Sequence, residues 1–131
     1  MQVLYISYDG MTDPLGQSQV IPYLIGLSEK GYQITIISCE KKDRFIDQKD
    51  AIELLLINSK ITWIPVNYST LPSALSKQLN ISRIRKKAFS FCKKNTPKIV
   101  HCRSYMSALI GLDIKNEFYS KFLFKIGRAH V

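Results

Sequence analysis

Residues 3–39, VLYISYDGMTDPLGQSQVIPYLIGLSEKGYQITIISC, follow the order strand, loop, helix, strand. Val3 to Tyr8 is an apolar and aromatic run that stops at Asp9-Gly10. A short apolar run that ends at a turn predicts a strand buried on both faces. Gln33 to Cys39 repeats this pattern, so we expect it to form a second strand.

The segment between these two strands predicts a helix. We expect Ser18 or Gln19 to cap its start and Gly31 to end it. Pro22 then falls in the first turn, where the missing amide hydrogen costs little. The apolar residues at helical spacing are Val20, Tyr23, Leu24 and Leu27.

The same alternation continues along the chain of 131 residues, which is long enough for one domain or part of one. Alternating strands and helices predict an α/β fold, a Rossmann-like parallel sheet with helices on both faces. Pro65 suggests that the third strand ends early or lies at an edge. The further expected elements are helix Asp43–Lys60, strand Ile61–Val66, helix Pro72–Lys94 (with Leu75 on its apolar side), strand Ile99–Cys102, helix Tyr105–Lys115 and a strand beginning at Phe122–Phe124.

The loop after the first strand is a candidate anion site. In a parallel sheet it lies at the carboxyl end of the strand and leads into a helix amino terminus, where backbone N–H groups attract anions. Gly16 would let a ligand approach the backbone, and Gln17 and Ser18 would add hydrogen bonds. The loop matches neither dinucleotide nor P-loop glycine patterns. The alternative is that Asp9-Gly10 and Asp13-Pro14 only turn the chain.

Charge is distributed unevenly along this chain, whose net charge is +9. No acidic residue occurs between Glu53 and Asp113. The basic stretch 81–94 could lie on an anionic membrane surface, or it could be a packed helix with a solvated basic face. Nucleic acid is not expected as a partner, because no recognition motif accompanies the charge. The cations of this stretch are Arg83, Arg85, Lys86, Lys87, Lys93 and Lys94.

Composition argues against several other classes of protein. The sequence has no secretion signal pattern and no apolar run of membrane-spanning length. Three cysteines, Cys39, Cys92 and Cys102, form no metal-binding or disulfide pattern, so we expect reduced, partly buried thiols and no metal. The sequon at Asn80 is then a chance match, and we expect a cytoplasmic protein.

Two segments carry a family resemblance. DPLGQSQVIPYLIGLSEKGYQITIIS (13–38) and KNTPKIVHCRSYMSALIGL (94–112) resemble, in the same order, two segments of glycosyltransferase family 4. The resemblance implies the amino-terminal, acceptor-side part of a GT-B fold. It also implies retaining, metal-independent transfer of a sugar from a nucleotide-sugar to an acceptor, often lipid-linked, in cell-surface polysaccharide or glycolipid synthesis. No cofactor is implied, and the location would be the cytoplasm or the inner face of the plasma membrane.

The resemblance also implies substrate-binding residues after the fourth strand. Many family members have His-x-His there, whereas this chain has His101-Cys102-Arg103 followed by Ser104. Arginine binds phosphate but does not act as a base near neutral pH, so Arg103 favours anion binding over proton transfer. His101 could instead be a strand-end histidine bonded to neighbouring backbone.

The end of the sequence departs from this family. Residues 126–131 resemble the translation of a sequencing adapter, so we expect a partial glycosyltransferase domain over 1–125 and a non-native tail over 126–131. The family's second domain, with its paired glutamates, would be missing, and this chain alone would be inactive. The alternative is a non-catalytic Rossmann-like module that docks through its basic helix.

Overall fold

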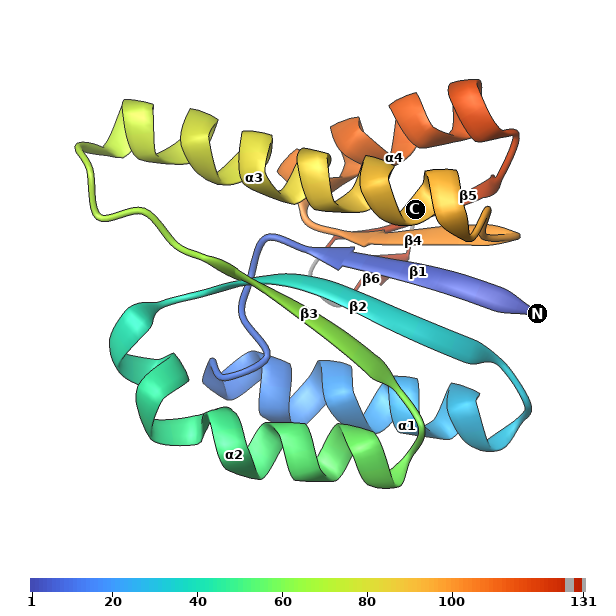
Figure 1. Cartoon of the computed structure of the whole chain (residues 1–131), viewed down its shortest axis with the longest axis horizontal. Coiled ribbons are helices and arrows are strands. Elements are labelled where there is room, and N and C mark those ends of the chain that lie inside the picture. The colour runs from blue at the N-terminus through green and yellow to red at the C-terminus, as the bar shows by residue number, and fades with distance from the viewer. Residues whose placement is uncertain (127–128, 131) are drawn as a thin grey trace.

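The computed structural model describes residues 1–126 and 129–130, which form one layered α/β domain (Figure 1). Its helical elements are η1 (Gly16–Val20), α1 (Ile21–Glu29), α2 (Lys42–Asn58), α3 (Ser73–Lys94) and α4 (Tyr105–Phe118). Its strands are β1 (Gln2–Ser7), β2 (Gln33–Glu40), β3 (Thr62–Asn67), β4 (Ile99–Arg103), β5 (Lys121–Ile126) and β6 (Ala129–His130). Each expected strand and helix is therefore present, with bounds shifted by a few residues.

The sheet has the strand order β3-β2-β1-β4-β5-β6. All neighbouring pairs from β3 to β5 are parallel, and only β6 pairs antiparallel, with β5. The order 3-2-1-4-5 is that of a Rossmann-like sheet, so the predicted fold class is confirmed. In this topology the order in which strands are added reverses between β1 and β4, and the loops that follow these two parallel strands lie side by side at the carboxyl edge.

Helices cover both faces of the sheet, with α3 and α4 on one side and α1 and α2 on the other (Figure 1). Alternate residues of β1 face the two layers, because successive strand residues point to opposite faces. Leu4 and Ile6 pack in the core beneath α3 and α4, whereas Val3 and Tyr5 pack in the core above α1 and α2. Both cores are buried, which fixes the register of β1 and the positions of the loops at its end.

The first helix begins differently from the sequence prediction. Helical backbone starts at Pro14 and passes through the π-type turn η1 into α1, where the Ile21 N–H donates to the Gly16 carbonyl. Within the described residues no side chain caps η1 or α1, so the expected cap by Ser18 or Gln19 is wrong. Pro22 does lie in the first turn of α1 as defined here, and Gly31 ends the helix with a φ of +98°.

Three further expectations concern the edges of the domain. Pro65 lies in β3, which is an edge strand as predicted. Leu75 is 59% exposed, so its expected place in the apolar face of α3 is wrong. Within the expected non-native tail, Ala129–His130 form β6, which pairs with β5, and residues 127, 128 and 131 lie outside the described part; the origin of residues 126–131 stays a prediction. No described helix combines the length and apolarity needed to cross a membrane.

Candidate functional site

A buried carboxylate occupies the carboxyl edge of β2. Glu40 is 2% exposed, and its two oxygens accept four hydrogen bonds. The Met11 N–H donates to Oε2 at 2.8 Å, and the Thr12 N–H and hydroxyl donate to Oε1 at 3.1 and 2.7 Å. The Ser38 hydroxyl also donates to Oε2. A buried charge with this many donors is well compensated.

The loop after β1 therefore does direct backbone N–H groups at an anion, but that anion belongs to the protein. The Met11 and Thr12 amides are taken by Glu40 and are not free for a ligand. Sequence reasoning missed Glu40, although one signal was available. An acidic residue that directly follows the second strand of a Rossmann-like sheet lies beside the loop after the first strand.

Gly16 has a packing function rather than the expected one. A Cβ atom built on it would lie 2.3 Å from the Gly10 carbonyl oxygen and 2.8 Å from the Met11 Cα. The side of Gly16 that lacks a side chain thus faces its own chain, and our expectation that it admits a ligand is wrong. Gln17 donates from Nε2 to the Thr12 carbonyl at 3.0 Å, and Ser18 is exposed.

An ion pair joins the loops that follow β1 and β4. The Arg103 side chain is 6% exposed, and its Nε lies 3.8 Å from Oδ2 of Asp9. Burial raises the pKa of Tyr5 to about 12, and a hydrogen bond with Arg103 acts in the opposite direction. Arg103 therefore links the end of β4 to the loop after β1. An anionic ligand would compete with Asp9 for the Arg103 guanidinium.

Ser104, the residue after Arg103, has an unusual backbone conformation. Its φ of 83° and ψ of 158° lie in a region that is essentially restricted to glycine, which costs on the order of 1–3 kcal/mol. Its hydroxyl lies 3.4 Å from that of Ser107 in the first turn of α4. The strain lies at the junction between β4 and α4, next to the Asp9–Arg103 pair.

His101 lies within β4 and not in the loop that the family resemblance implied. It is 3% exposed, and the ring centroids of Tyr5 and Tyr23 lie 4.9 and 5.7 Å from its own, both edge-on. The structure thus places His101 in the core beneath the carboxyl edge, apart from the exposed loop residues.

A second charged group, missed in the sequence, surrounds Asp13. Its carboxylate accepts the Gly10 N–H at 3.1 Å and lies 3.7 Å from Lys41 Nζ and 3.5 Å from Arg44 Nε. These residues border a cavity of about 240 Å³, and Lys42, Tyr68 and Glu40 border another of about 380 Å³. The carboxyl edge of the sheet therefore carries cavities whose linings combine cations with the carboxylates of Asp9, Asp13 and Glu40.

The basic residues of α3 are all exposed, but two of them are engaged. Arg83 donates to the Asn67 carbonyl at 2.9 Å, and Arg85 pairs with Asp113 and covers the Phe89 ring at 4.6 Å. The other four predicted cations are lysines with exposed side chains: Lys86, Lys87, Lys93 and Lys94.

The thiols and the sequon are buried. Each cysteine is free and at most 2% exposed, so the thiols are more deeply buried than the sequence suggested. Asn80 is 0% exposed and accepts the Ser69 N–H at 2.7 Å, which leaves no access for glycosylation in the folded chain. No described group of three His, Cys, Asp or Glu side chains is placed to hold a metal.

Comparison with known proteins supports the fold and no more. No protein-family model and no curated protein matches the chain. Two crystal structures of the C-terminal domain of a hydrogenase from Pyrococcus furiosus are similar at 15% identity, with TM-scores of 0.71 and 0.66. Each alignment covers 95% of this chain, and 90% and 89% of the two hydrogenase chains. At this identity the likeness describes the Rossmann-like architecture alone.

Proposed function

We propose that this chain forms the acceptor-side, amino-terminal domain of a retaining glycosyltransferase. The transferase would move a sugar from a nucleotide-sugar to an acceptor in cell-surface polysaccharide or glycolipid synthesis. The observation that carries the proposal is the place of the two resembling segments. The first segment begins within the loop after β1, and the second contains β4 and the loop after it. The Asp9–Arg103 pair joins the loop after β1 to the end of β4 at 3.8 Å.

The chemistry of this edge suits an acceptor that carries an anionic group. Arg103 offers a guanidinium that binds a phosphate bidentately once Asp9 is displaced. Lys41 and Arg44 add positive charge beside the same edge, although Asp13 shares it. Catalytic residues are not assigned, because the proposed donor site would lie on a second domain.

Sugar transfer by the full-length product of the gene that encodes this chain tests the proposal. The proposal requires a second domain in that product, and we expect transfer from a nucleotide-sugar to a lipid-linked acceptor. We also expect Arg103→Gln to raise the KM for an anionic acceptor, whereas Lys30→Gln, an exposed change at the end of α1, leaves it unchanged. A full-length product without a second domain would refute the proposal.

The second candidate function is a binding module that docks through α3, and the four exposed lysines favour it. Whether the chain is a transferase domain or a binding module, we propose that the α3 surface with Lys86, Lys87, Lys93 and Lys94 contacts an anionic membrane. Each lysine would contribute about 1 kcal/mol near the membrane surface. Co-sedimentation with phosphatidylserine vesicles should fall with added salt and in a Lys86→Gln, Lys87→Gln, Lys93→Gln, Lys94→Gln variant. Equal binding by this variant would exclude α3 as the contact.

A further inference from the structure

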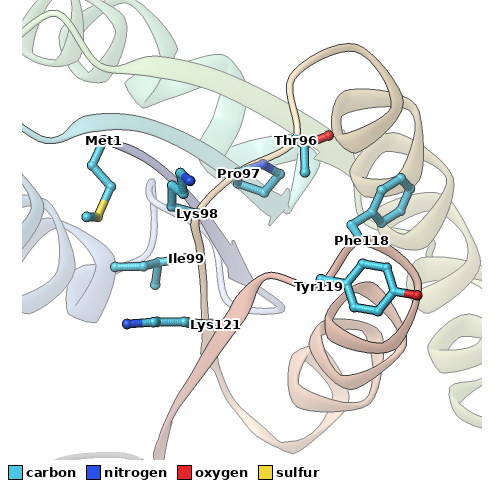
Figure 2. A pocket seen from close by; sticks show the side chains of 8 residues that line it. All are labelled: Met1, Thr96, Pro97, Lys98, Ile99, Phe118, Tyr119 and Lys121. Carbon is cyan, nitrogen blue, oxygen red and sulfur yellow. The ribbon is translucent and has the colours of Figure 1, made fainter.

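A further cavity lies at the opposite edge of the sheet from the candidate site. It measures about 620 Å³ and opens where β4 and β5 begin (Figure 2). Met1 and Ile99 lie on one side of it with the lysines, and the rings of Phe118 and Tyr119 lie on the other (Figure 2). Its lining is thus mainly apolar, with a few polar groups at the margin, which is the usual composition of a small-molecule site.

The walls of this cavity are held in place by hydrogen bonds between its two loops. The Ser120 hydroxyl donates to the Pro97 carbonyl at 2.6 Å, and the Lys121 N–H donates to the Lys98 carbonyl at 2.9 Å. Lys98 is in turn bonded through its N–H to the Gln2 carbonyl. A cavity with fixed walls needs little reorganisation to bind a ligand.

Two ammonium groups give the cavity its charge preference. Lys98 and Lys121 line it, and neither forms an ion pair within the described part of the chain. The carboxyl termini of α3 and α4 lie near this edge and carry negative partial charge. Lysines in the last turns of those helices offset that charge, namely Lys93, Lys94 and Lys115. Lys98 and Lys121 lie outside the helices and are left to attract an anion.

We propose that this cavity binds an amphiphile that joins one anionic headgroup to a short apolar body. The lysines would hold the headgroup, and Ile99, Phe118 and Tyr119 would contact the apolar body. The volume lies within the range of about 300–1,000 Å³ that is usual for such sites. Tyr119 is 90% exposed, so it has room to contact a ligand at the mouth of the cavity. The site does not depend on the proposed transferase activity.

Amide NMR titration of the whole chain tests this assignment. The probes are octanoate, octyl phosphate, octanol and inorganic phosphate. We expect octanoate and octyl phosphate to produce saturable shifts at residues 98–99 and 118–121, and the tighter of the two identifies the headgroup. Octanol and inorganic phosphate should each bind more weakly, since each offers only half of the contacts.

Matched variants complete the test. Lys98→Gln with Lys121→Gln should raise the Kd for the anionic amphiphile about two- to thirtyfold, the effect of losing two exposed charge contacts. Lys49→Gln with Lys77→Gln removes equal charge from exposed positions on α2 and α3 and should leave the Kd unchanged. The proposal is overturned if no probe shifts these residues, if octanol binds as tightly as octanoate, or if both double variants behave alike.

Discussion

Replacing Glu40 by glutamine should destabilise the domain strongly, although it changes a single atom of the side chain. The amide would present an NH₂ group where one carboxylate oxygen now accepts two hydrogen bonds. In one orientation the NH₂ group meets the Met11 N–H, and in the other it meets the Thr12 N–H. The neighbouring hydroxyl can rotate to accept, but a backbone N–H cannot.

The magnitude follows from these contacts. One buried N–H without an acceptor costs about 1–3 kcal/mol, and each remaining bond loses about 1 kcal/mol as its acceptor becomes neutral. Two bonds remain on the amide oxygen in either orientation, so we expect Glu40→Gln to lower the free energy of unfolding by about 3–5 kcal/mol, a large part of the 5–15 kcal/mol typical of a domain.

Urea unfolding followed by tryptophan fluorescence measures this change directly. Trp63 is the single tryptophan, and its indole N–H donates at 2.8 Å to the Ser38 hydroxyl, which donates to Glu40. The emission of the folded variant should therefore also shift. The control is Glu53→Gln, an exposed position on α2. If both variants unfold at the same urea concentration, the argument that Glu40 holds the loop after β1 is refuted.

Two further predictions concern packing and protonation. Gly16→Ala should lower the free energy of unfolding by about 1–3 kcal/mol, because its Cβ would collide with Gly10. Gly26→Ala on α1, where a Cβ meets nothing within 4 Å, should be neutral or stabilising. Equal urea midpoints for the two variants would contradict this. Burial raises the pKa values of Cys39, Cys92 and Cys102 to about 12, 11 and 12, so the native thiols keep protons that unfolded thiols lose above about pH 9. Above about pH 9 the unfolded chain therefore binds fewer protons than the native chain, so stability falls as the pH rises. We expect the urea midpoint to fall as the pH is raised above about 9, and a midpoint that stays constant would contradict this prediction.

The sheet was predictable from the sequence because its strands are buried on both faces. Such strands are continuous apolar runs between turn residues, as in Gln33–Glu40, and alternation with helices then fixes parallel pairing. The start of the first helix was not predictable in the same way. Ser18 resembles a cap, but the close contact between Gly16 and Gly10 lets the helical backbone begin earlier, at Pro14.

The site was less predictable, because its partners are distant in sequence. Gly16 was singled out because it lacks a side chain, but only the fold shows that its own chain, and not a ligand, lies against it. The contact between Glu40 and Met11 spans 29 residues, and that between Arg103 and Asp9 depends on the neighbouring places of β4 and β1. Single-residue patterns indicate which groups need partners, and the topology decides which partners they find.

Sugar transfer is the most direct test of the proposal that this chain is the acceptor-side domain of a glycosyltransferase. The full-length product of the gene that encodes this chain and the isolated residues 1–131 would each be incubated with nucleotide-sugars and a lipid extract. We expect a glycosylated lipid from a gene product that includes a second domain and none from the isolated residues 1–131. Transfer by the isolated residues, or no transfer by the full-length product with any nucleotide-sugar, would refute the proposal.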